Sequence, residues 1–215
     1  MIKENEMYKP LKRSLEVHGF TVAAEVQLCD VVAYKDGETR AIELKNTLNL
    51  KVIEQAYRHV GTANRVYVGV TMPKYNEMSK NSFAIKVLQK FNIGLYYIGY
   101  DSFLGMKVIE ALTPEYNEIT KRPLHAAITE ANMLAIGGSK SGDTITPYKL
   151  TMQRVKAFLE ENPRSTAKEI IENVETHYKG KTPHNTLANE LRMRYNHSWC
   201  KVDYRGRTPL FSVKE

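Results

Sequence analysis

The chain has 215 residues, of which 42% are hydrophobic, and carries a formal net charge of +7. This length and composition suit one large globular domain or two small ones with ordinary packed cores. No apolar run approaches the ~20 residues of a membrane-spanning helix, and the N-terminus lacks the pattern of a secretion signal. We therefore expect a soluble cytoplasmic protein without a membrane partner, and the positive charge favours nucleic acid as its anionic partner.

The number and spacing of the cysteines and histidines limit which disulfides and metal sites the chain can form. Cys29 and Cys200 are too few for a disulfide framework or a thiolate zinc site, and we assign neither a role. The six histidines show no H-E-x-x-H or comparable ligand spacing, which argues against a zinc hydrolase.

Helical and extended patterns alternate over the first hundred residues and predict a mixed α/β sheet flanked by helices. The region 101–135 gives no clear prediction. The expected elements are helices over 4–18, 50–63 and 83–91, strands over 21–26, 65–70 and 94–98, and a hairpin between the first strand and the second helix.

The hairpin turns at Asp36-Gly37, a dipeptide typical of a two-residue type I′ loop. Counting outward from this loop pairs Lys35 with Glu38 and places Asp30 opposite Glu43. Directly opposed like charges are destabilising, so this pairing is unusual for an ordinary surface.

Period-two alternation places Asp30, Glu43 and Lys45 on one face of the hairpin. A bound cation would relieve the repulsion between the two carboxylates. The alternative is a solvated strand face on which Lys45 simply neutralises a carboxylate, as is common for an isolated E-x-K. Val31, Ile42 and Leu44 are expected on the opposite face.

A glycine- and serine-rich stretch over 137–143 indicates a linker. It is not a phosphate-binding loop, because Gly138 is followed by Ser139 rather than by the Lys of a Walker motif. We predict one domain over 1–136, a linker over 137–148 and a second domain over 149–215. The net charge is +3 over 1–140 and +4 over 141–215, so positive charge is concentrated in the shorter piece.

The second domain has the pattern of three helices and a hairpin, which predicts a winged helix-turn-helix. One helix spans about 150–161, a second begins at a capping box formed by Thr166 and Glu169, and a third opens at Thr182-Pro183. Two short strands over 199–204 and 209–213 follow.

The third helix carries two stripes. An inward stripe is expected for Leu187, Ala188, Leu191 and Tyr195. A polar stripe of Asn185, Asn189, Arg192 and Asn196 is expected either to read bases in a major groove or to be a plain solvent face; asparagine is a poor helix former, which favours base reading. Phosphate contacts are expected from Lys179, Lys181, Arg205 and Arg207.

The first domain resembles the PD-(D/E)XK nuclease superfamily, in which an Asp precedes a turn and a (D/E)-x-K motif lies on the next strand. Asp30 and Glu43-Leu44-Lys45 match this motif, with Cys29 at the position of the eponymous proline. Residues 4–8, 25–30 and 65–67 are also similar to a bacterial family of phosphodiesterases of this type.

This resemblance implies a restriction-endonuclease-like fold and a site for Mg²⁺, with Mn²⁺ as a substitute. The ion would be held by Asp30, Glu43 and the carbonyl of Leu44, while Lys45 would orient the attacking water. The resemblance further implies a supporting role for Gln55. An additional acidic group would come from Glu4 or Glu25.

The second domain resembles the HARE-HTH winged helix of restriction endonucleases and chromatin proteins, through residues 166–171 and 180–187 and through Phe211. Together the two resemblances imply a Mg²⁺-dependent DNA endonuclease of the restriction or defence kind, without an organic cofactor, that selects double-stranded DNA through the winged helix. Cutting both strands requires two active sites, so a homodimer is plausible. The alternatives are a DNA-binding regulator that keeps the nuclease fold without catalysis, and a repair or resolvase-type nuclease that reads DNA shape.

Overall fold

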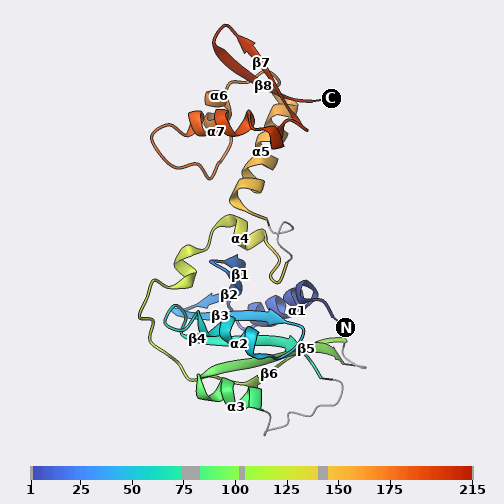
Figure 1. The fold of residues 1–215 in the computed structure, drawn as a ribbon, viewed down its shortest axis with the longest axis vertical. Coiled ribbons are helices and arrows are strands. Elements are labelled where there is room, and N and C mark those ends of the chain that lie inside the picture. The colour runs from blue at the N-terminus through green and yellow to red at the C-terminus, as the bar shows by residue number, and fades with distance from the viewer. Residues whose placement is uncertain (1, 74–82, 102–104, 140–144, 215) are drawn as a thin grey trace. The chain divides into compact units, whose positions relative to one another are not determined.

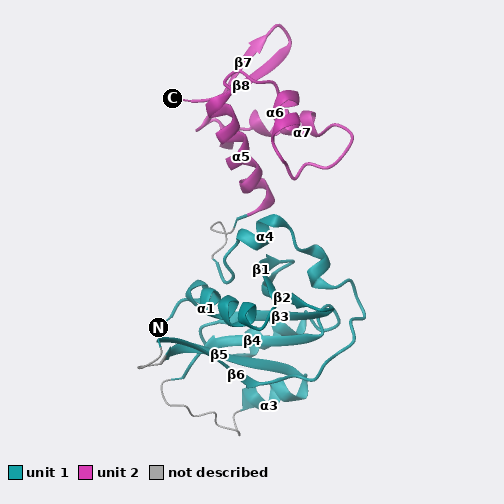
Figure 2. Ribbon diagram, turned by 180° about the vertical axis from the view of Figure 1, so that it is seen from behind, with its two compact units in different colours: residues 1–145 teal, residues 146–215 magenta. Residues whose placement is uncertain are grey.

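The computed structural model describes residues 2–73, 83–101, 105–139 and 145–214. The chain forms two compact units, residues 1–145 and 146–215 (Figure 2). The boundary falls inside the stretch predicted as a linker, of which residues 140–144 lie outside the described residues. None of the described helices is long and apolar enough to cross a membrane.

The first unit is built on one six-stranded mixed sheet in the order β1-β2-β3-β4-β5-β6 (Figure 1). The pairs β3–β4 and β4–β5 are parallel and the other neighbours are antiparallel. The predicted mixed α/β class is therefore confirmed. The strands are β1 (Thr21–Val26), β2 (Cys29–Lys35), β3 (Glu38–Lys45), β4 (Arg65–Thr71), β5 (Ile93–Asp101) and β6 (Gly105–Leu112).

Helices cover both faces of this sheet, and each buries an apolar stripe. Helix α1 (Glu4–Val17) packs Met7 and Leu11 with Ile42 and Leu44 on one face. Helices α2 (Leu50–Tyr57) and α3 (Phe83–Lys90) pack on the other face against strand residues such as Ala41. Neighbouring residues of β3 thus point to opposite cores, as the period of a strand requires.

The hairpin of β2 and β3 has the predicted turn and register. Asp36 and Gly37 have φ of +47° and +85°, and Lys35 pairs with Glu38. The last described backbone pair is Val31 with Ile42, so the ladder opens at the next position, where Asp30 comes opposite Glu43. Val31, Ile42 and Leu44 all lie in the core beneath α1, as predicted.

Helix α2 is shorter than the predicted 50–63. It begins where the Asn49 side chain accepts a hydrogen bond from the Val52 amide, at 3.0 Å, and ends at Tyr57. Tight turns follow, with the Thr62 amide bonding the His59 carbonyl and Gly61 at φ +84°. The helix has thus ended before the left-handed Gly61, which the apolar spacing alone does not reveal.

The region without a clear prediction contains β6, the 3-10 helix η1 (Leu124–Ala127) and helix α4 (Glu130–Leu134). The Asn132 side chain on α4 donates to the carbonyls of Ala24 and Glu25, at 3.0 and 2.8 Å. Helix α4 is therefore hydrogen-bonded to the backbone at the end of β1.

The second unit contains helices α5 (Pro147–Glu161), α6 (Ala167–Asn173) and α7 (Pro183–Leu191), the 3-10 helix η2 (Arg194–Asn196), and the hairpin β7 (Cys200–Arg205) and β8 (Thr208–Val213). The capping box at the start of α6 is present, with the Thr166 amide donating to Glu169 at 2.7 Å. Val155, Ile170, Leu187 and Phe211 meet in the core.

Two predictions for the third helix are wrong at its end. Tyr195 is 60% exposed rather than part of the inward stripe, and Asn196 is buried rather than on the polar stripe. The cause is that α7 ends at Leu191, so the helical spacing does not extend to these residues. The Asn196 side chain instead bonds the Tyr148 hydroxyl and accepts from the Trp199 indole.

Candidate active site

Four carboxylates and one amine gather where the hairpin ladder opens. Glu4 begins α1, Glu25 lies near the end of β1, Asp30 is in β2, and Glu43 and Lys45 are in β3. The Lys45 Nζ lies 2.9 Å from Glu4 Oε1 and 3.0 Å from Glu4 Oε2. The first unit therefore brings together the motif residues and both additional acids that the sequence singled out.

Asp30 is the electrostatic centre of this cluster. Its Oδ2 accepts a hydrogen bond from the Leu44 amide at 2.8 Å, in place of a backbone pair of the ladder. Desolvation, followed by the charge of Glu43, raises the pKa of Asp30 to about 8 against the opposing hydrogen bond from Leu44, and Glu25 and Glu4 add smaller contributions. Burial and the neighbouring charge of Glu43 thus favour the protonated form of Asp30 at neutral pH when no cation is bound.

Glu43 is buried and is held by a residue that sequence reasoning missed. The His59 Nε2 lies 2.7 Å from Glu43 Oε1, and the His59 side chain is also buried. A signal was available, because His59 follows Val52 by seven positions and Ala56 by three, and so continues the buried stripe of α2.

Gln55, expected to support the site, is half-buried on α2. Within the described chain no hydrogen bond joins its side chain to Asp30, Glu43 or Lys45. His59, one turn further along, makes the contact with Glu43 instead.

The backbone of residues 137–139 forms one wall of the cluster. A Cβ at Gly137 would lie 2.5 Å from the Asp30 carbonyl oxygen, and Gly138, at φ +69°, packs against the backbone of Glu4. The Ser139 amide donates to Glu25 Oε1 at 3.4 Å, although burial still raises the pKa of Glu25. The start of the predicted linker is therefore a packed part of the first unit.

Cys29 also borders the cluster. Its thiol lies 3.3 Å from the Val31 carbonyl oxygen, and the side chain is fully buried. Burial, followed by the charges of Glu43 and Asp30, raises the pKa of Cys29 well above its usual range. The thiol is therefore protonated when no cation is present.

The residues expected to bind DNA lie on the surface of the second unit. Lys179 and Lys181 are exposed between α6 and α7, and Arg205 and Arg207 are exposed on either side of the β7–β8 tip. Asn185, Asn189 and Arg192 are exposed on or just after α7, and the Arg192 Nη2 donates to Asn189 Oδ1 at 2.6 Å. A base that binds the same two atoms would compete with this hydrogen bond.

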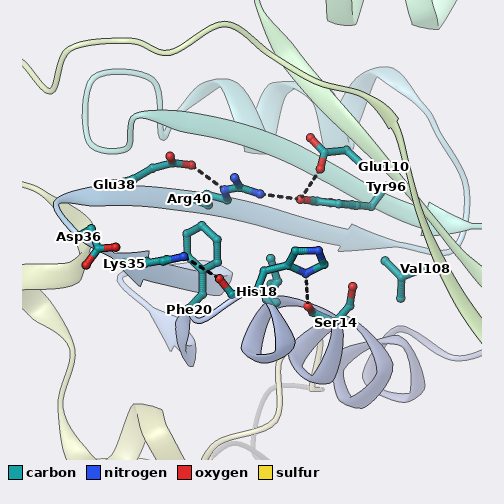
Figure 3. A pocket seen from close by; sticks show the side chains of 11 residues that line it. Ser14, His18, Phe20, Lys35, Asp36, Glu38, Arg40, Tyr96, Val108 and Glu110 are labelled. Carbon is teal, nitrogen blue, oxygen red and sulfur yellow. Dashed lines mark hydrogen bonds and ion pairs between the residues drawn. The ribbon is translucent and has the colours of Figure 1, made fainter.

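Away from the acidic cluster, a hollow of about 580 Å³ lies on the α1 side of the sheet, at the turn end of the hairpin (Figure 3). Two of its charged groups, Arg40 and Glu38, already pair with each other. The Arg40 side chain donates to Glu38 at 2.7 Å and to the Tyr96 hydroxyl at 3.1 Å, and it stacks on Phe20. The acidic cluster, in which four carboxylates lie near one lysine amine and one imidazole, is the stronger candidate for chemistry.

Comparison of the chain with family models, with curated proteins and with solved structures gave no match. The interpretation of the site therefore depends on its own geometry and charge.

Proposed function

We propose that this protein is a divalent-metal-dependent DNA endonuclease, in which the first unit hydrolyses phosphodiester bonds and the second unit binds double-stranded DNA. The observation that carries the proposal is the convergence of Asp30, Glu43 and Lys45 where the β2–β3 ladder opens. A helix, a three-stranded meander, a helix and a further strand surround these residues in the order known from PD-(D/E)XK nucleases.

The donor set fits Mg²⁺, with Mn²⁺ as a substitute. Asp30 and Glu43 would supply carboxylate oxygens and Leu44 its backbone carbonyl, and magnesium prefers such oxygen ligands while keeping several waters. The raised pKa of Asp30 is consistent with this assignment, because it arises from burial first and from the charge of Glu43 second, and a bound cation would offset both. When bound, the ion would polarise the scissile phosphate and acidify a water molecule.

The protein side chains have separate tasks in this proposal. Lys45 orients the attacking water and balances the charge that develops on the phosphorane. Glu4, at 2.9 Å, holds the Lys45 amine in place, and His59, at 2.7 Å, fixes the direction of the Glu43 carboxylate. Glu25 contributes further negative charge near Asp30.

For the second unit we propose a winged helix that selects the DNA, as in restriction or defence systems. Its three helices and hairpin and its exposed cations support this role. Lys179, Lys181, Arg205 and Arg207 would contact phosphates, which position a protein without reading sequence. Asn185, on α7, is exposed and available to a base edge. Two active sites, and hence two copies of the chain, would cut both strands.

The test is cleavage of supercoiled, linear, methylated and branched DNA by the full chain in Mg²⁺ and in EDTA. Lys45→Met should lower the Mg²⁺-dependent rate by about 100-fold or more. Lys51→Ala, which removes an exposed amine on neighbouring α2, should leave the rate unchanged. Preference for branched DNA would indicate a resolvase-type enzyme. Salt-sensitive binding without cleavage of any substrate would overturn the nuclease proposal in favour of a regulator.

A further inference from the structure

Three potential metal ligands of a different kind meet beside the carboxylate cluster. They are the thiol of Cys29 at the start of β2, the carboxylate of Glu43 in β3 and the imidazole of His59 after α2. Their ligand atoms all lie within 4.8 Å of one another, and the side chains are 0%, 3% and 7% exposed. Among the described residues this is the one such group with three buried members.

The β1–β2 ladder is irregular next to Cys29, and this irregularity determines the direction of the thiol. Regular alternation would place Cys29 with Val31, in the core beneath α1. Cys29 lies instead in the core beneath α2, together with Val26, the residue with which it pairs. Glu25, with φ of +56°, interrupts the β1–β2 ladder just before this pair. This local departure turns the thiol toward Glu43 and His59.

We propose that Cys29, Glu43 and His59 form a site for a thiophilic divalent ion of the zinc or cobalt class. Thiolate, imidazole and carboxylate are the donors that zinc takes, whereas magnesium does not use sulfur or prefer nitrogen. Bond lengths of about 2.0–2.3 Å in a tetrahedral site put ligand atoms roughly 3.5 Å apart. Small side-chain rotations from the present arrangement reach that spacing, including an opening of the 2.7 Å contact between Glu43 and His59.

Binding would release one proton. The Cys29 thiol loses its proton to solvent as the metal–sulfur bond forms. The proton in the contact between His59 Nε2 and Glu43 moves to Nδ1 of the same ring when Nε2 binds the ion, and no oxidant or reductant is needed. Three protein ligands leave the fourth position to a water molecule, the arrangement of an exchangeable rather than a closed structural site.

Glu43 would belong to both metal sites, so the two ions would compete. The thiophilic ion would draw Glu43 away from Asp30 and inhibit Mg²⁺-dependent cleavage. This consequence depends on the proposed nuclease function, whereas binding of the thiophilic ion does not.

The test is titration of the reduced, EDTA-stripped full chain with Co²⁺. Coordination by a thiolate produces a sulfur-to-cobalt charge-transfer absorption in the near ultraviolet. Wild type and Cys200→Ser, which removes the other buried thiol, should show this absorption with one equivalent of Co²⁺. Cys29→Ser should lose it and His59→Gln should weaken binding at least tenfold, while Asp30→Asn should retain it.

A second measurement, the change in melting temperature on adding Zn²⁺, keeps the proposal testable if one of these variants folds poorly. Zn²⁺ should raise the melting temperature of the wild type and of Cys200→Ser but not that of Cys29→Ala, because a ligand that binds only the folded state stabilises it. Absence of the absorption in wild type, or an equal signal in Cys29→Ser, would overturn the metal site whatever the cleavage assay gives. Absence of cleavage together with a normal cobalt signal would count against the nuclease alone.

Discussion

Replacing Asp30 by Asn should stabilise the metal-free protein, by an amount that grows with pH. The folded chain raises the pKa of Asp30 from 3.8 to about 8, so between these values the folded state binds more protons than the unfolded state. The stability associated with this group is therefore complete below about pH 4 and is lost as pH rises toward 8. Asn cannot ionise, and its side-chain oxygen can still accept from the Leu44 amide.

The size of the effect follows from the pKa change. One pKa unit corresponds to about 1.4 kcal/mol, so the wild-type free energy of unfolding should fall relative to the variant by at most about 1.4 kcal/mol per pH unit. The high effective dielectric near a partly exposed site reduces the expected difference at pH 7 to roughly 1–3 kcal/mol.

The assay is urea unfolding in EDTA at several pH values, followed by circular dichroism. Fluorescence of Trp199, the single tryptophan, reports the second unit and separates its transition from that of the first. Asp36→Asn is the matched control, because it makes the same change at an exposed position of the same hairpin. Parallel pH dependence of Asp30→Asn and wild type would refute the inference that Asp30 belongs to a crowded acidic cluster.

Three further predictions concern backbone conformation in the first unit. Gly137→Ala should destabilise the first unit by about 1–3 kcal/mol in urea unfolding, because its Cβ would meet the Asp30 carbonyl at 2.5 Å; stability equal to wild type would show that the 137–139 wall is not packed as described. Leu28→Gly should instead stabilise by about 1 kcal/mol, because Leu28 is 89% exposed at φ +68° and loses almost no packing. Gly37→Ala should lower the free energy of unfolding, because alanine is strained at φ +85° even though no atom lies within 4 Å of the new Cβ.

The sequence predicted those parts of the fold that local rules govern. The Asp36-Gly37 turn determines the hairpin register by counting, and the Thr166–Glu169 capping box marks the start of α6. Both signals involve residues within four positions of each other, so they can be read without knowing the contacts of distant parts of the chain.

The parts that were missed depend on contacts between distant residues. His59 meets Glu43 only because α2 packs on β3 and then stops at Tyr57, and Cys29 joins them only because β1 is irregular at Glu25. The helical spacing of the sequence also predicts a third helix that continues past Leu191, where α7 ends. Asn196 was therefore wrongly expected on an exposed helix face. Such features follow from packing that no short window of sequence contains.

The site described for the first unit has a consequence for biosynthesis. Its members extend from Glu4, through the hairpin and His59, to the amide of Ser139, and so span almost the whole unit. A chain emerging from the ribosome carries its first acidic residue early but completes the wall of the cluster only when residues 137–139 are free to pack. Translation itself would thus delay completion of the cluster, and with it any activity of the proposed kind, until the unit is finished, and truncated chains would be released without a complete site.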